Sequence, residues 1–188
     1  MRTTYYTATS LDGFIADPAD SLAWLFVQTH VEPDEPALRY DALMERVGAL
    51  VMGATTYEWI RDRVTAAEEA WSYDVPTWVL THRDLPGLEG ADVRFASGDV
   101  TAVHAEIEAS AGGRDLWVVG GGDLAGQYAD AGLLDDVVVS YAPVTLGEGR
   151  PLLPRRLQLR LAEHVGAGDF VCARYLVDGP RPAPDWTP

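Results

Sequence analysis

Three consecutive glycines stand between an apolar segment and a segment with helical spacing, and this arrangement could bind a phosphate. Residues 116–119 are apolar and rich in β-formers, Gly120, Gly121 and Gly122 follow, and Asp123 stands where a helix would begin. The order predicts a buried strand, a tight turn and a helix capped by Asp123. Glycines let backbone N–H groups approach a ligand, and the positive end of a helix dipole attracts a phosphate or pyrophosphate. The alternative is that these glycines only form a crowded turn.

A second segment of the same kind surrounds Gly53. Residues 49–52 are apolar, and Thr55 with Glu58 fits the capping-box pattern just after the glycine. Two strand–glycine–helix segments could hold two phosphate groups of one cofactor, although Thr55 could also act only as a helix cap. Arg83 follows a strand expected at residues 77–81, and it could either anchor a phosphate or lie in a solvated loop.

Composition limits the classes of function. The net charge of −15 argues against nucleic acid or an anionic membrane as a partner, and no apolar run reaches the roughly 18 residues that span a bilayer. Cys172 is the only cysteine, so we expect no intramolecular disulfide and a cytoplasmic protein. All basic residues other than histidine are arginine, which excludes Schiff-base lysine chemistry and a Walker-type phosphate loop. We expect no metal site.

The chain of 188 residues suits one domain, expected at residues 1–178, with a flexible proline-rich tail at residues 179–188. The patterns predict strands at residues 3–9, 49–52, 77–81, 93–96, 116–119, 137–143, 157–161 and 170–177. Five helices are expected between these strands. Two precede residue 49: a short helix at 21–26 and one that is opened by Pro36 and runs to Val47. The others are a helix with Tyr57, Ile60 and Val64 on its buried face, a helix capped by Asp99, and a helix at 124–131.

This alternation predicts an α/β fold of three layers. A mixed, mostly parallel sheet would lie between helices on both faces, with an antiparallel C-terminal hairpin at one edge. Ligands in such folds bind outside the carboxyl ends of the strands. Gly53, Thr81 and Gly120 all fall at such ends.

With these segments placed, the chain resembles the dihydrofolate reductase-like family. The more specific similarity is to the branch related to the reductase domain of bacterial riboflavin biosynthesis, the RibD C-terminal domain. Four segments in order carry the resemblance: residues 10–16, 51–58, 118–124 and 143–149. The resemblance implies a dihydrofolate reductase-like three-layer fold, NADPH as cofactor with NADH as the alternative, a small-molecule substrate and a homodimer.

The resemblance also implies the residues of the site. The expected cofactor-binding residues are Ala8, Ile15, Ala16, Gly53, Ala54, Thr55, Thr56, Leu80, Thr81, His82, Arg83, Gly120, Gly121, Gly122, Asp123, Leu124 and Ala125. The expected substrate-binding residues are Trp24, Asp34 and Tyr57. Asp12, Ser140 and Tyr141 would border the substrate, where Asp12 or a water held by the other two could supply a proton. Asp12 could equally be only a turn residue.

Three positions depart from the family pattern. Ala54 stands where relatives usually carry Arg, Tyr6 where riboflavin-pathway reductases carry Lys, and Gly120 where they tend to carry Glu. The last two departures indicate a substrate other than a sugar phosphate. The resemblance, taken with these departures, implies a reductase that transfers hydride to a C=N or C=O of a small pterin- or pyrimidine-like heterocycle.

Two other functions are compatible with the sequence. A conventional Rossmann dehydrogenase would use the G-x-G-x-x-A spacing of Gly120, Gly122 and Ala125. A binding module that kept the cofactor cleft without turnover would be compatible with Ala54.

Overall fold

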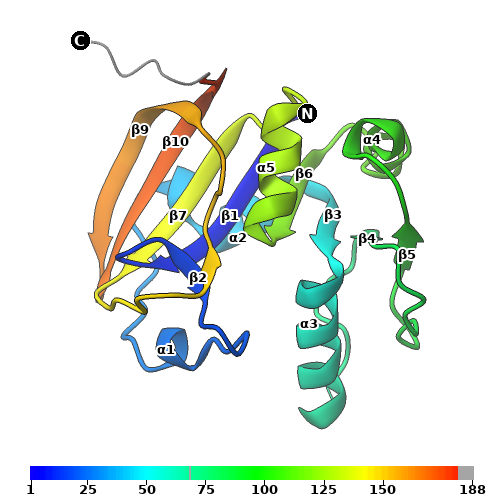
Figure 1. The fold of residues 1–188 in the computed structure, drawn as a ribbon, viewed down its shortest axis with the longest axis horizontal. Helices are drawn as coiled ribbons and strands as arrows, with labels where there is room; N and C mark the ends of the chain where they lie inside the picture. The colour runs from blue at the N-terminus through cyan, green and yellow to red at the C-terminus, as the bar shows by residue number, and fades with distance from the viewer. Residues whose placement is uncertain (68, 182–188) are drawn as a thin grey trace.

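The centre of the molecule is an eight-stranded sheet, which the computed structural model shows within the described residues, 1–67 and 69–181 (Figure 1). Its strand order is β5-β4-β3-β6-β1-β7-β10-β9. The strands from β5 to β7 run parallel, and β10 is antiparallel to both β7 and β9. The strands are β1 Thr3–Ser10, β3 Val47–Gly53, β4 Thr77–Leu80, β5 Val93–Ala96, β6 Asp115–Gly120, β7 Asp136–Ala142, β9 Leu157–Ala167 and β10 Phe170–Pro180. The expected mixed sheet with an antiparallel hairpin is confirmed.

Helices connect most of the parallel strands, although β4 passes to β5 without one, and a small second sheet pairs β2 (Phe14–Ala16) with β8 (Arg150–Pro151). The helices are α1 Ala23–Phe26, α2 Tyr40–Arg46, α3 Ala54–Ala67, α4 Val100–Ser110 and α5 Gly122–Asp130, with a 3-10 turn η1 at Pro36–Leu38. No helix in the described part of the chain is both long and apolar enough to cross a membrane.

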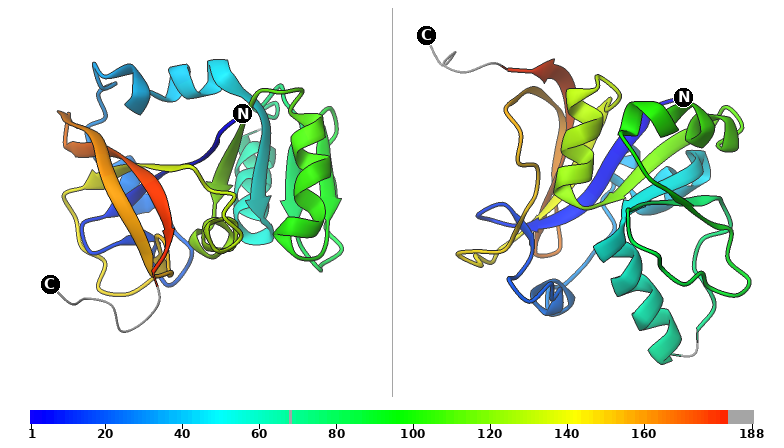
Figure 2. Two further views of the ribbon diagram at one scale, coloured as in Figure 1. Left: turned by 90° about the horizontal axis from the view of Figure 1, so that it is seen from above. Right: turned by 45° about the vertical axis from the view of Figure 1, so that its right-hand side comes forward.

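Side chains that alternate along each strand form a hydrophobic core on each face of the sheet. In β3, Ala49 and Val51 join a buried cluster that includes residues of α4 and α5. Leu50 and Met52 point to the other face, where they join clusters with residues of α2 and α3. Because successive residues of a strand face opposite sides, one apolar strand serves both helical layers. The left view of Figure 2 shows α2 and α5 on opposite sides of the sheet, which confirms the three layers.

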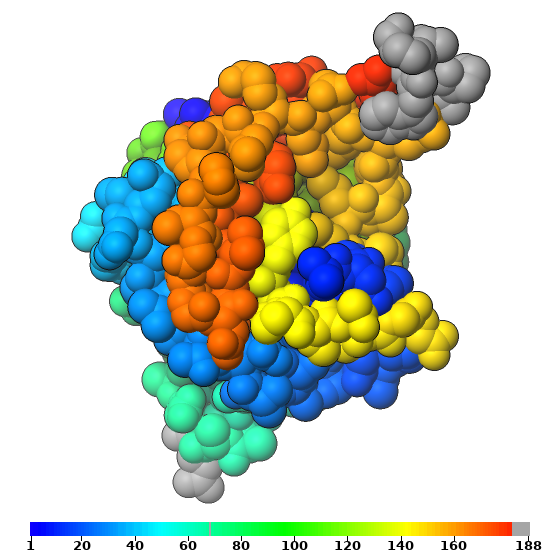
Figure 3. All heavy atoms as spheres, turned by 90° about the vertical axis from the view of Figure 1, so that its left-hand side faces the viewer, coloured from blue at the N-terminus to red at the C-terminus, as the bar shows by residue number. Residues whose placement is uncertain are grey.

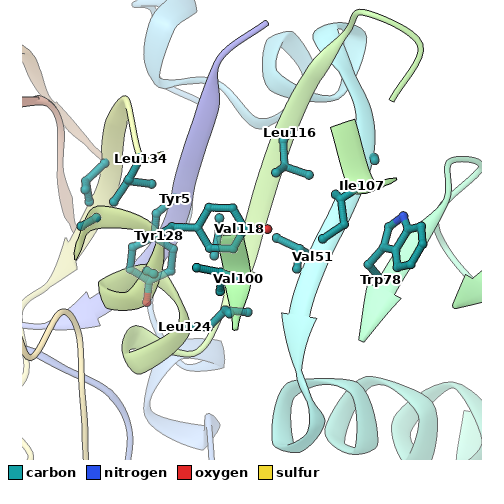
Figure 4. Packing of buried hydrophobic residues seen from close by; sticks show 14 of the residues in the cluster. Tyr5, Val51, Trp78, Val100, Ile107, Leu116, Val118, Leu124, Tyr128 and Leu134 are labelled. Atoms are coloured by element: carbon teal, nitrogen blue, oxygen red, sulfur yellow. The ribbon is translucent and has the colours of Figure 1, made fainter. Parts of the chain in front are cut away.

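The larger core lies beneath α5. Figure 4 shows Tyr5 of β1 and Val118 of β6 packed with Leu124 and Tyr128 of α5. Tyr5, Val118 and Tyr128 are completely buried. Burial of a large aromatic side chain stabilises a fold by about 1.5–3 kcal/mol, so this contact anchors α5 and, with it, the glycine turn at its start.

Two local expectations differ from the structure. The helix expected to run to Val47 is broken at Arg39, whose extended backbone separates η1 from α2, and Val47 is the first residue of β3. The strand β10 continues through Gly179 and Pro180, beyond the expected end of the domain. Residues 182–188 lie outside the described residues, so the tail stays a prediction. By contrast, Asp99 caps α4 as predicted, because its carboxylate accepts a hydrogen bond from Thr101 N at 2.8 Å.

Gly48 in β3 provides a test of the packing. A methyl group at Gly48 would lie 2.1 Å from the carbonyl oxygen of Ala111, a backbone atom that cannot move aside without shifting the end of α4. We expect Gly48→Ala to lower the free energy of unfolding by about 1–3 kcal/mol, the usual cost of overpacking. Urea denaturation of the variant measures the change.

Gly166→Ala in β9 is the matched control. A methyl group there would have no atom within 4 Å, so we expect its free energy of unfolding to stay within about 0.5 kcal/mol of the parent chain. Equal effects of the two substitutions would contradict the close approach of β3 and α4.

Candidate functional site

A cleft of about 660 Å³ opens at the carboxyl ends of the parallel strands. Both glycine turns border it: the turn from β3 into α3 and the turn from β6 into α5. The remaining lining comes from the ends of β1 and β4, the segment from β2 to α1, and β8. This is the edge at which open α/β sheets bind ligands, and its volume is typical of small-molecule sites.

The first turn passes directly from strand to helix. Gly53 ends β3 and Ala54 begins α3, so Thr55 lies inside the first helical turn. The predicted capping box is therefore wrong. The carboxylate of Glu58 instead accepts hydrogen bonds from Arg83. Thr55 and Thr56 both border the cleft, where their hydroxyl groups are available to a ligand.

The second turn is formed by the three glycines, and the peptide bond between Gly120 and Gly121 is cis. Gly121 is the N-cap residue of α5, and the cap prediction for Asp123 is wrong. Asp123 Oδ2 accepts from Gln127 Nε2 at 2.8 Å, and its Oδ1 accepts from Arg155 Nη2 at 2.9 Å. These hydrogen bonds, the Gln127 bond first, hold the pKa of Asp123 below its ordinary value.

The glycines of the second turn have different surroundings. A methyl group at Gly122 would lie 2.2 Å from Pro151 O and 2.3 Å from Leu152 O, so this residue must be glycine for α5 to pack against β8. A methyl group at Gly121 would lie 3.9 Å from its nearest neighbour, Ile15 Cδ1, and one at Gly53 would lie 4.0 Å from Gly120 O. Gly53 and Gly121 therefore leave open space on the cleft side of the two turns.

The segment between β2 and α1 covers one end of the cleft. Asp20 binds Arg150 of β8 through two hydrogen bonds of 2.5 and 2.9 Å, and both residues line the cleft. Hydrogen bonding to Arg150 holds the pKa of Asp20 below its ordinary value. Phe26 of α1 stacks on Trp59 of α3, with ring centres 6.2 Å apart and planes 10° from parallel. These two contacts fix the covering segment to β8 and to α3.

Most residues of the expected cofactor set lie around this cleft. Those that line it are Ile15, Ala16, Gly53, Ala54, Thr55, Thr56, Leu80, Thr81, His82, Gly120, Gly121, Gly122, Asp123 and Leu124. Ala8, Arg83 and Ala125 are outside this lining. Ala125 is completely buried in the core beneath α5, and Arg83 borders a neighbouring hollow that shares Thr81 and His82 with the cleft.

The expected substrate residues lie elsewhere. Tyr57 is completely buried, and its hydroxyl donates to Pro86 O at 2.7 Å. Trp24 packs against the core around Leu38, and Asp34 is exposed in the loop before η1. None of the three borders the cleft. The cleft is also lined by residues that the sequence did not single out as site residues: Thr7, Asp20, Leu22, Trp59, Gly98, Val119, Gln127, Arg150 and Pro151.

Asp12 joins two loops rather than facing the cleft. Its carboxylate accepts hydrogen bonds from Ser10 Oγ at 2.6 Å and from Gly147 N at 2.7 Å, with Leu146 N at 3.1 Å. Figure 3 shows the yellow segment around residue 145 against the dark-blue N-terminal segment. The Ser10 bond is the main cause of the lowered pKa of Asp12. A carboxylate with a lowered pKa is a poor general acid at neutral pH.

Ser140 and Tyr141 are neighbours in β7 and therefore face opposite sides of the sheet. Ser140 Oγ lies 3.3 Å from Cys172 Sγ, and Cys172 is buried. Burial is the main cause that raises the pKa of the Tyr141 hydroxyl, which is hydrogen-bonded to Tyr175. Neither side chain borders the cleft.

Asp12 is expected to stabilise the fold in a pH-dependent way. Its folded-state pKa lies below its unfolded-state value of about 3.9, so the stabilisation is complete above that pH and is lost as the pH falls through the folded-state pKa. We expect Asp12→Asn to lower Tm at neutral pH, with a difference from the parent chain that shrinks below about pH 4. Calorimetry across this range, with Asp74→Asn at an exposed site as control, measures it. A pH-independent difference would contradict this role.

Comparison with known proteins places this cleft in a family. The sequence pattern of the RibD C-terminal domain matches residues 3–172. YwjB of Bacillus subtilis (strain 168), an uncharacterised protein, is 26% identical over 178 residues, which cover 93% of this chain and 97% of YwjB.

Solved structures show the same fold. A Shewanella sp. PV-4 protein whose structure is named for riboflavin biosynthesis has a TM-score of 0.77 and 29% identity, covering 95% of this chain and 99% of its own. Dihydrofolate reductase from Enterococcus faecalis, complexed with NADP(H) and RAB-propyl, has a TM-score of 0.56 and 15% identity, covering 94% and 96%. The chain belongs to the RibD C-terminal domain family and has a dihydrofolate reductase-like fold.

Proposed function

We propose that the chain is a reductase that uses a reduced nicotinamide dinucleotide, NADPH in the first instance, to reduce a C=N or C=O bond of a small planar heterocycle. The observation that carries the proposal is the adjacency of two glycine turns at one cleft, each with open space on the cleft side. Membership of the RibD C-terminal domain family supports a reductase.

The residues around the two turns fit a dinucleotide. The N-terminal ends of α3 and α5 both border the cleft, and helix N-termini attract phosphate groups through their free N–H groups and dipoles. Gly53 and Gly121 leave room for a pyrophosphate to approach the backbone. The Thr55 and Thr56 hydroxyls can donate further hydrogen bonds to it. When bound, the cofactor supplies the hydride.

The covered end of the cleft suits an uncharged, planar substrate. Trp59, Leu22 and Val119 provide an apolar lining there. Asp20 and Arg150 are the charged side chains of this end among the described lining residues, and they are bound to each other. A phosphate group would therefore compete with Asp20 for Arg150, which favours a pterin- or pyrimidine-like ring without a phosphate.

Solvent water is the proton donor that this cleft favours. Asp20 and Asp123 are the carboxylates among its described lining residues, and hydrogen bonds hold the pKa of each below the ordinary value. Both are ionised at neutral pH and are unsuited to donate a proton. The covering segment would exclude bulk water while the reacting groups are held together.

Nucleotide binding and turnover are measured separately. Titration of the chain with NADPH and NADH, followed by tryptophan fluorescence, reports binding. Consumption of the reduced nucleotide in the presence of pterin- and pyrimidine-like compounds reports turnover. Binding without turnover on any of them would identify a binding module instead of a reductase, and the absence of binding would refute the proposal.

Gly121→Val tests the site directly. Its side chain would project into the cleft rather than into the protein, because the nearest atom to its Cβ is 3.9 Å away. We expect the affinity for NADPH to fall by at least about tenfold, since the side chain fills space the pyrophosphate needs. Gly166→Val, far from the cleft in β9, is the control. Unchanged NADPH affinity in a folded Gly121→Val variant would contradict the proposed position of the cofactor at this turn.

We also propose that the chain forms a homodimer. Leu161 of β9 and Val171 of β10 are 50% and 53% exposed, and their pairing with Tyr175 and Gly166 puts both on one face of the hairpin. Exposed apolar side chains that share a face are typical of association surfaces. Light scattering is expected to give the mass of two chains. A single-chain mass at all working concentrations would contradict this.

A further inference from the structure

The ion pair between Glu58 and Arg83 lies beside the open end of the cleft. Arg83 Nη1 donates to Glu58 Oε1 at 3.2 Å, and Nη2 donates to Oε2 at 2.6 Å. Both side chains reach solvent, with 52% of Arg83 and 29% of Glu58 exposed. Exposed pairs of this kind are weak, so a ligand phosphate could compete for the guanidinium.

The two ends of the cleft differ in the protection that they offer. The segment from β2 to α1 covers one end, held by Asp20–Arg150 and Phe26–Trp59. The other end, at the carboxyl ends of β4 and β5, continues into a shallow hollow of about 330 Å³ lined by Thr81, His82, Arg83, Asp84, Phe95, Ala96 and Ser97. Hydride transfer requires exclusion of water, so the nicotinamide belongs at the covered end and the adenosine at the open one.

NADPH differs from NADH only by a phosphate on the adenosine ribose. Among the described residues that line the hollow or the neighbouring part of the cleft, the arginine that could bind this phosphate is Arg83. Its partner Glu58 lines neither the cleft nor the hollow, but its carboxylate lies 2.6 Å from the Arg83 guanidinium and repels a phosphate that approaches it. The free ribose hydroxyl of NADH carries no charge and is not repelled in this way.

We propose that Glu58, by holding Arg83, sets the choice between NADPH and NADH and prevents a strong preference for NADPH. This inference rests on the proposed function, because it concerns the cofactor of the same cleft. In the parent chain a ribose phosphate would gain Arg83 but would meet the charge of Glu58. We therefore expect the dissociation constants for NADPH and NADH to lie within about tenfold of each other.

Single substitutions of Glu58 and of Arg83 should shift the NADPH affinity in opposite directions and leave the NADH affinity nearly unchanged. Glu58→Gln keeps the shape and removes the charge, so it is expected to tighten NADPH by about tenfold and to change NADH by less than about twofold. Arg83→Met is expected to weaken NADPH by about tenfold, because Glu58 is then uncompensated, and to leave NADH nearly unchanged. The double variant should return the NADPH to NADH ratio towards that of the parent chain.

The matched control is Asp62→Asn, which removes a carboxylate one turn further along α3. Asp62 binds Arg61, and neither residue borders the cleft or the hollow, whereas Arg83, the partner of Glu58, lines the hollow. We expect it to leave the ratio unchanged. The Glu58→Gln effect should also shrink at high salt, because a charge exposed to solvent is screened. An Asp62→Asn effect as large as that of Glu58→Gln would assign the change to net charge and overturn the inference.

Calorimetric titration with 2′,5′-ADP and 5′-ADP isolates the adenosine end. Glu58→Gln should tighten 2′,5′-ADP and not 5′-ADP, in parallel with NADPH and NADH. If nucleotides bind but Glu58→Gln alters both members of each pair equally, the role of Glu58 is refuted while the proposed function stands. If no nucleotide binds the parent chain, the proposed function fails and this inference fails with it.

Discussion

The hydrogen-bonded ladder between β3 and β6 is the constraint on which the site depends. It pairs Val51 with Val118 and Met52 with Gly120, so two turns that are far apart in the sequence leave the sheet side by side. Each turn leads at once into a helix, and the cores on both faces hold these helices in place. Two helix N-termini therefore converge on one cleft. A ligand with two linked phosphates matches that arrangement better than any single-phosphate ligand does.

The cover of the cleft depends on a second set of contacts. β2 and β8 pair with each other, Asp20 binds Arg150, and Gly122 lies against the carbonyl groups of residues 151 and 152. Asp12 ties the β1–β2 turn to the loop after β7. Because these contacts link the start of α5 to the covering segment, the second glycine turn and the covered end form one structural unit. The charged side chains of this unit mostly bind other groups within it. The surface that they leave for a substrate is therefore largely apolar, and solvent water remains as the proton donor.

Local patterns in the sequence predicted the elements, and they also located the cleft. Gly53, Thr81 and Gly120 follow apolar strands, and parallel strands bring such ends to one edge. The Asp20–Arg150 contact was not predictable, because its partners are 130 residues apart, one in a loop and the other in the two-residue strand β8, where the sequence has no periodic signal. Tyr57 was predicted as a substrate residue from the family resemblance, although its helical spacing with Ile60 and Val64 already indicated a buried face. The family resemblance thus predicted a substrate contact for Tyr57 and the helical periodicity a buried side chain, and the structure agrees with the periodicity.

The central claim is that one dinucleotide spans both glycine turns, and a crystal structure of the chain with NADP⁺ tests it most directly. The account predicts density for the pyrophosphate between the N-terminal ends of α3 and α5, with the nicotinamide beneath the segment from β2 to α1 and the adenosine beside Thr81 and His82. A nucleotide that contacts only one of the two turns, or that binds on another face of the molecule, would contradict it.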